Sequence, residues 1–103
     1  SLAKPPTAMF CYNDVTALGA MRDAHARGLA IPADMSIVGF DDLFFAEYTQ
    51  PPLTTIRQPA RKMGRLAMEA LLKLLAGGDA VPTLRVAGEL IIRESTAAPR
   101  KLK

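Results

Sequence analysis

A short apolar run that ends in a glycine and two adjacent aspartates constrains this chain more than any other feature. The run covers residues 36–40, and Asp41 and Asp42 follow it directly. Apolar, β-branched residues bounded by a glycine predict a buried strand, and the break places both carboxylates just beyond its carboxyl end. Open parallel sheets bind ligands at that edge. The sequence therefore predicts a ligand edge at this pair of aspartates.

An earlier strand-like segment ends in the same way. Residues 7–12 lead into Asn13 and Asp14, where a helical pattern begins. Strand, helix and the next strand, about 35–40, form a βαβ unit, which nearly always joins parallel strands by a right-handed crossover. Asn13 is either the N-cap of the helix or a ligand contact, because its amide offers both a donor and an acceptor. The two strand ends are expected to line one crevice.

The first helix has an apolar stripe and a flank of small residues. The stripe predicts its buried face and consists of Leu18, Met21, His25 and Leu29, and the flank consists of Ala17, Ala20 and Ala24. His25, the single histidine, is interpreted as a packed residue because no catalytic partner faces it. Gly28 is the predicted left-handed residue that ends the helix.

The second half of the chain alternates prolines with regular patterns. Residues 43–48 predict a one-turn helix with an exposed aromatic edge, and 53–58, which lie between prolines, predict a crossing strand. The strongest helical periodicity runs over 60–76, and glycines at 77 and 78 end it. A final extended segment is expected over 84–94. The fold class is therefore α/β, with a parallel sheet flanked by helices.

Composition limits the classes of function. The chain has 103 residues and a formal charge of +3, which Arg100, Lys101 and Lys103 account for. A charged tail of this kind predicts a solvated end rather than a nucleic-acid-binding face. No apolar stretch is long enough for a membrane span or a signal peptide, so we expect no membrane partner and a cytoplasmic setting.

The reactive residues do not assemble into a catalytic or metal site. Cys11 lies in an apolar run, with no histidine or second cysteine at ligand spacing, and predicts a small core residue. No nucleophile, base or metal set is available, so neither an enzyme nor a cofactor is expected.

The paired aspartates allow several interpretations. General acid–base work would need a facing partner, and metal binding would need a third ligand. Accepting hydrogen bonds from a hydroxyl-rich ligand needs nothing further. Asp42 is more simply a local cap of the next turn, and Gln58 either lines the cleft or completes the crossing segment. Phe44, Phe45 and Tyr48 are core or a subunit contact, or alternatively an aromatic wall for a ligand.

Six segments together resemble the effector-binding domain of LacI/GalR-type (lactose-repressor-like) transcription regulators. They are residues 10–14 (FCYND), 17–20 (ALGA), 28–32 (GLAIP), 36–42 (SIVGFDD), 51–58 (PPLTTIRQ) and 93–96 (REST). The resemblance covers nearly the whole chain in order. It implies a two-lobed α/β domain of periplasmic-binding-protein type, with a small effector such as a sugar or nucleobase bound between the lobes.

The resemblance also implies roles for individual residues. Asn13 and Asp41 become the effector contacts, with Gln58 as a weaker candidate. The helix after Asn13 and the aromatic segment become the contact of a homodimer, with the candidate residues Val15, Leu18, Met21, Phe44, Phe45 and Tyr48. DNA would be bound through a helix-turn-helix, a motif that these residues do not contain.

The implied lobes divide the sequence into four parts. Residues 1–57 resemble part of the C-terminal lobe, 58–83 a crossover and helix of the N-terminal lobe, 84–96 a strand returning to the C-terminal lobe, and 97–103 a tail. Such a lobe is incomplete and offers half of a binding site. The alternatives are a sugar-binding protein of a transport system and a module that only dimerises.

Overall fold

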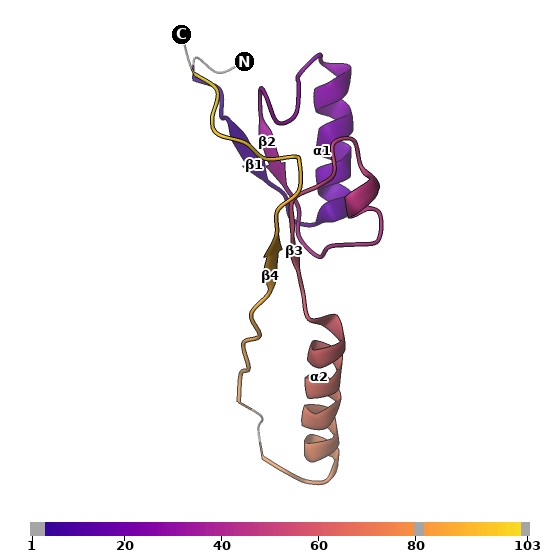
Figure 1. Ribbon diagram of the computed structural model, residues 1–103. Helices are drawn as coiled ribbons and strands as arrows, with labels where there is room; N and C mark the ends of the chain where they lie inside the picture. Colours follow the sequence, from indigo (N-terminus) through magenta and orange to yellow (C-terminus); the bar gives the residue numbers. More distant parts are fainter. Residues whose placement is uncertain (1–3, 80–81, 102–103) are drawn as a thin grey trace. The chain divides into compact units, whose positions relative to one another are not determined.

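The computed structural model describes residues 4–79 and 82–101 (Figure 1). The chain forms two compact units. The first unit consists of residues 1–57 and 89–103, and the second unit consists of residues 58–88. Each unit has its own packing and is described separately.

The first unit begins with the predicted βαβ arrangement. Strand β1 (Ala8–Phe10) pairs in parallel with β2 (Ser36–Val38), and helix α1 (Asp14–Ala26) connects them (Figure 1). Both strands are shorter than the predicted 7–12 and 35–40. The backbone beyond β1 has to turn into the helix, and it keeps contact with β2 through a 2.8 Å bond from Cys11 N to Val38 O.

A crossing segment lies beside β2. Isolated parallel bridges join Val38 to Thr54 and Asp41 to Arg57. Strand β3 (Thr55–Arg57) then pairs antiparallel with β4 (Glu89–Ile91). Within the extended segment predicted over 84–94, these three residues are the ones that find a partner strand among the described residues.

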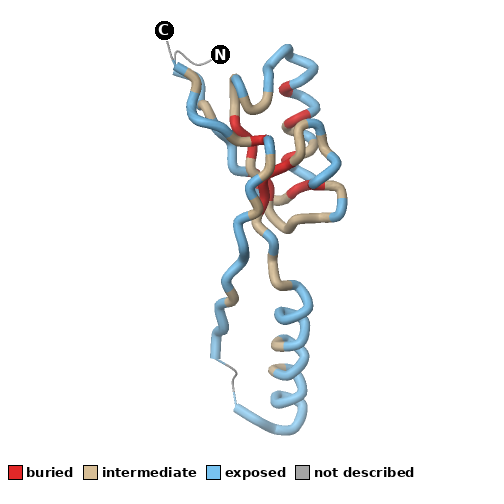
Figure 2. Tube along the Cα trace, in the orientation of Figure 1, coloured by how far each residue is buried: buried red, intermediate tan, exposed pale blue. Residues whose placement is uncertain are grey.

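The core of the first unit lies between α1, β2 and the loop before β3 (Figure 2). Its buried cluster consists of Cys11, Ala17, Met21, Ile37, Ala46 and Leu53. The predicted buried face of α1 is partly wrong, since Leu18 is only half-buried and His25 is exposed. The alanine flank faces the core instead, because small side chains let the helix approach β2 closely.

The turns of the first unit largely follow the sequence. The predicted single turn is a 3-10 helix, η1 (Ala46–Tyr48). Gly28 has a φ of 78°, which confirms the predicted left-handed end of α1. The tail differs from the solvated end predicted, because the Arg100 guanidinium donates to the carbonyl oxygens of Pro6 and Asp34. Lys101 is exposed, and Lys103 lies outside the described residues.

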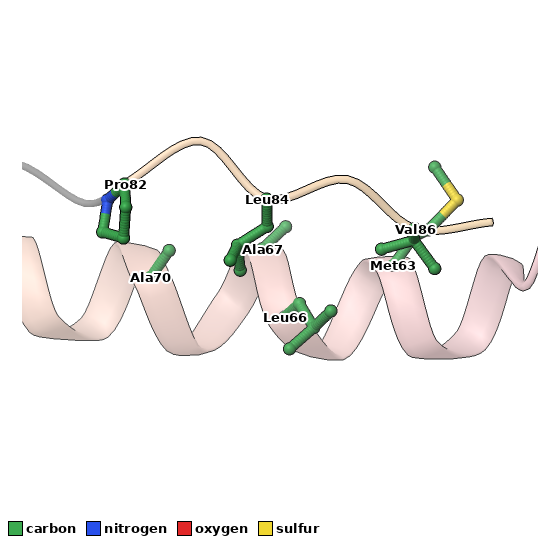
Figure 3. A pocket seen from close by; sticks show the side chains of 7 residues that line it. All are labelled: Met63, Leu66, Ala67, Ala70, Pro82, Leu84 and Val86. Carbon is green, nitrogen blue, oxygen red and sulfur yellow. The ribbon is translucent and has the colours of Figure 1, made fainter.

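The second unit is one long helix and an extended strap. Helix α2 (Ala60–Leu75) contains no buried residue (Figure 2). Gly77 has a φ of 89° and its N–H donates to Leu74 O, which confirms the predicted glycine end. The strap of residues 82–86 runs along the apolar side of the helix (Figure 3). This unit therefore packs without a core of its own.

Candidate functional site

The polar ends of β1 and β2 lie side by side. Asp14 N donates to Phe40 O over 3.0 Å, so the backbone after β1 stays paired with the backbone after β2. Asn13 and Asp41 flank this bond, and both are half-buried. The structure thus brings two of the three predicted effector contacts to one edge of the parallel pair, where open α/β sheets bind ligands.

Asn13 is the N-cap of α1, one of the two roles that its position allows. Its Oδ1 accepts a 2.8 Å hydrogen bond from Thr16 N, and its backbone is extended. This bond satisfies one of the unpaired N–H groups at the start of the helix. This hydrogen bond is accepted by Oδ1 of the Asn13 side chain. The NH₂ of the same amide carries two N–H donors.

Asp41 has an unusual backbone. Its φ is 120°, and the φ of Asp42 is 57°. Non-glycine residues rarely adopt positive φ, and such conformations cost about 1–3 kcal/mol each unless the surroundings impose them. The Asp41 N–H donates to Ile56 O over 2.9 Å, which ties this turn to β3. Strained backbone of this kind clusters at functional sites.

Asp42 does not act as the predicted local cap. Its carboxylate lies between two guanidinium groups, at 2.7 Å from Arg57 Nε and 2.8 Å from an Arg93 terminal nitrogen. Its side chain is only 9% exposed. Burial by itself would raise the pKa of Asp42, but hydrogen bonds and charges from both arginines outweigh it and lower the pKa below its ordinary value of 3.8.

The carboxylate that binds the backbone leading into the next turn is that of Asp14, a role that sequence reasoning misses. Its fully buried carboxylate accepts 2.6 Å hydrogen bonds from Leu43 N and from Thr55 Oγ1. Gly39 makes room for it, because a Cβ at this position would lie 2.2 Å from Asp14 Oδ1. The glycine inside an apolar run is the one sequence signal of this close approach.

The segment after β4 ties the crossing segment to β2. Ser95 Oγ donates to Ile37 O over 2.6 Å and accepts from Thr54 N over 2.8 Å. Ile37 N in turn donates to Ser95 O. Arg93 donates from its guanidinium to Leu53 O over 2.9 Å. Residues 93–96 stand out in the sequence only through the family resemblance. In the structure they hold the crossing segment against β2, the strand that leads to Asp41 and Asp42.

Gln58, the third predicted effector contact, begins the second unit. Its side chain is half-buried, and its backbone oxygen accepts a 2.8 Å hydrogen bond from Ala60 N at the start of α2. This hydrogen bond lies between the end of β3 and the start of α2. It agrees with the interpretation in which Gln58 completes the crossing segment. Its contact with an effector stays a prediction.

The predicted subunit-contact residues divide by exposure. Val15, Phe44 and Tyr48 are exposed, with Phe44 at 85% and Tyr48 at 78%. The rings of Phe44 and Phe45 pack edge to face, with centroids 5.7 Å apart. Phe44 and Tyr48 are therefore not core residues, so the core interpretation of the aromatic cluster is wrong for these two side chains. Met21 is buried, whereas Leu18 and Phe45 are half-buried.

Two further kinds of feature, metal-ligand groups and membrane-spanning helices, concern residues 4–79 and 82–101. No three acidic, histidine or cysteine side chains in these ranges gather as metal ligands. Within the same part of the chain, no helix has the length and hydropathy to span a bilayer. Cys11 is buried, as predicted, and desolvation raises the pKa of its thiol, which disfavours the reactive thiolate.

The second unit contains an apolar groove. It has a volume of about 300 Å³ and is lined by Met63, Leu66, Ala67, Ala70, Pro82, Leu84 and Val86 (Figure 3). Its lining has no polar side chain, so it offers a hydroxyl-rich ligand no side-chain hydrogen bonds. The aspartate edge of the first unit is the better candidate.

The family described as periplasmic binding protein-like domain matches residues 1–96. This chain belongs to that family. Among its relatives, the transcriptional repressor CytR of Escherichia coli K12 is 48% identical over 98 residues, which cover 94% of this chain and 29% of CytR. The repressor PurR of Vibrio cholerae is 49% identical over 73 residues, which cover 71% of this chain and 22% of PurR. The chain thus spans less than a third of these relatives.

Solved structures of the family agree with this assignment. A dimeric Lac repressor with an 11-residue C-terminal deletion aligns with a TM-score of 0.80 and 41% identity, over 92% of this chain and 35% of the repressor. The complex of the regulator CelR with cellobiose aligns with a TM-score of 0.77 and 36% identity, over 86% and 28%. The predicted resemblance to the effector-binding domain of LacI/GalR-type regulators, with its periplasmic-binding-protein-like α/β fold, is confirmed.

Proposed function

We propose that this chain senses a small effector for a DNA-binding transcription regulator, and that Asn13 and Asp41 contact the effector. The observation that carries the proposal is the 3.0 Å bond from Asp14 N to Phe40 O, which brings the two side chains to one sheet edge. An ionised carboxylate accepts hydrogen bonds from neighbouring O–H or N–H donors through both of its oxygens, and an amide supplies donors beside it. This pair suits a sugar or a related polyhydroxylated molecule.

The family supports regulation as the setting for this site. The relatives CytR and PurR are transcriptional repressors, and CelR binds cellobiose in its complex. These names favour a regulator over a transport protein or an enzyme. We propose that the effector lies between two lobes, that residues 58–83 belong to the other lobe, and that the regulator acts in the cytoplasm.

The proposed mechanism is a shift between two lobe arrangements. An effector can move this equilibrium only by its difference in affinity for the two states. The contacts at Asp41 would supply part of that difference, and operator affinity would change by the same coupling free energy. The aspartate edge would therefore control the response to the effector without contacting DNA.

A chimera tests this function. The 98 matching residues of E. coli CytR are replaced by the matching segment of this chain, and operator binding is measured against a panel of monosaccharides, cellobiose, purine bases and nucleosides. We expect at least one compound to change operator affinity, and Asp41→Ala to remove that response while operator binding persists. Asp23→Ala, which changes an exposed aspartate of α1, is the control. A response that Asp41→Ala leaves intact would argue against the proposal.

We also propose that the regulator dimerises through the exposed residues Val15, Phe44 and Tyr48, with Leu18 and Phe45 at the margin. Met21 is left out because its side chain is buried in the core. Exposed aromatic side chains are typical anchors of protein interfaces. Tyr48→Asp should convert a dimeric chimera into a monomer in sedimentation, whereas Lys101→Asp should not. A dimer that survives Tyr48→Asp would remove this surface from the proposal.

A further inference from the structure

The Asp42 carboxylate binds one residue of β3 and one residue just after β4, the two strands next to the second unit in the sequence. Arg57 is the last residue of β3 and the last of the first unit before residue 58. Arg93 follows β4 by two residues, just after the chain has returned. Asp42 binds the first through Oδ2 and the second through Oδ1. The two carboxylate oxygens of Asp42 thus each bind one arginine, one at the end of β3 and one just after β4.

The same residue lies next to the strained backbone of Asp41. A φ of 120° persists in an aspartate only where neighbouring contacts impose it. On the carboxyl side of Asp41, those contacts include the two ion pairs of Asp42, a 3.4 Å bond from Asp42 N to Thr55 Oγ1, and the bond from Leu43 N to Asp14. Of these, the ion pairs are the contacts with full charges on both partners.

This arrangement differs from an ordinary surface ion pair. The Asp23 and Arg27 pair of α1 has a similar 2.8 Å separation, but its side chains are 66% and 72% exposed. Solvent screens such a pair, and it contributes little to the structure around it. The Asp42 side chain is 9% exposed and the Arg93 side chain 15%, so their bond is much less screened.

We propose that Asp42 is a positioning residue of the effector edge. Its carboxylate, by binding Arg57 and Arg93 together, holds the Asp41 backbone at positive φ and so aims the effector-contacting side chain. The proposal rests on the proposed function for the role of Asp41, but the position of that backbone exists without any effector. A uniform loss of stability would not produce this effect, since it would leave the native conformation of Asp41 unchanged.

The test measures the Asp41 backbone directly by NMR on the whole chain, without ligand. The three-bond coupling between the amide and α protons of Asp41 is small at a φ near 120° and large in an extended strand. Asp42→Asn removes the charge and keeps a residue that tolerates left-handed backbone. We expect the coupling to rise in this variant, while the amide shifts of Ala17 and Met21 in α1 keep their values.

Two further variants complete the experiment. Asp23→Asn removes the exposed ion pair of α1 and should leave the Asp41 coupling unchanged. Arg57→Gln removes the half-exposed arm of the Asp42 arrangement, together with the longer 3.9 Å pair between Arg57 and the exposed Glu89, and should raise the coupling partway even where Asp42→Asn fails to fold. An Asp41 coupling that stays small in every folded variant overturns the proposal. Because no effector is added, this result is independent of whether Asp41 binds one.

Discussion

The two units of this chain bury their side chains very differently. In the first unit, a cluster of apolar side chains and several buried polar groups, among them Asp14, Thr55 and Ser95, pack and hydrogen-bond together. In the second unit, α2 has a clear apolar stripe and no buried residue. The first unit therefore contains its own determinants of structure, whereas the apolar face of α2 is covered only in part, by the strap of residues 82–86.

The difference between the units bears on where a ligand contact is expected. The candidate effector edge lies in the unit whose backbone is held by buried hydrogen bonds and ion pairs. A precise ligand contact requires such support, because a loosely held side chain cannot fix the geometry of its partner. The second unit, with its exposed stripe, is instead suited to an apolar contact.

The largest expected effect compares leucines in the two units. Leu53 is fully buried, so Leu53→Ala should reduce the free energy of unfolding by about 2–5 kcal/mol through lost burial and a cavity. Leu75 is 74% exposed, so Leu75→Ala should change it by less than about 0.5 kcal/mol. Urea unfolding followed by far-UV circular dichroism measures both. Equal losses would show that α2 is as well packed as the core of the first unit.

Two glycines provide the next contrast. Gly39→Ala should destabilise the chain by about 1–3 kcal/mol, because the new Cβ would lie 2.2 Å from Asp14 Oδ1 and 2.9 Å from Leu53 Cδ2. Gly64 lies in α2, where an added Cβ would meet no atom within 4 Å, so Gly64→Ala should stabilise that helix by about 1 kcal/mol. Thermal unfolding should show opposite signs for the two variants. A neutral Gly39→Ala would contradict the close approach of Asp14.

A smaller effect concerns pH. Asp42 has a folded-state pKa below its ordinary value, so its contribution to stability is present above about pH 4 and is lost as the pH falls through the folded pKa. The urea midpoint should therefore fall less steeply between about pH 5 and about pH 2 in Asp42→Asn than in the unchanged chain. Asp23→Asn, at an exposed pair, should keep the original slope. Identical slopes for all three would show that the arginines do not stabilise the Asp42 carboxylate.

The local part of the fold can be predicted from the sequence. The parallel strands, both long helices, the Asn13 cap and the glycine ends of the helices depend on neighbouring residues and on periodicity. The face of α1 is harder, since its alanines and its larger apolar residues both recur at helical spacing. Only the distance to β2 decides which set fits the core.

The contacts of the candidate site are less accessible to sequence reasoning. Asp42 is expected to cap its own turn, but its partners are Arg57 and Arg93, 15 and 51 residues further along the chain. The backbone that leads into that turn is bound instead by Asp14, 29 residues before Leu43. Such pairings follow from how strands lie side by side, which no local pattern encodes. The end of the strand marks both aspartates alike, and Asp41 is singled out only through the resemblance to LacI/GalR-type regulators.

The most direct test of the account is Asp41→Gly in the CytR chimera, with stability and effector response measured on the same preparation. Glycine accepts a φ of 120° without strain, so the fold should be kept as the relieved strain offsets the lost side-chain contacts. The effector response should nevertheless disappear, because the accepting carboxylate is gone. A stable variant that no longer responds to the effector is the predicted result. A variant that responds with unchanged effector affinity would contradict the assignment of Asp41 as the effector contact.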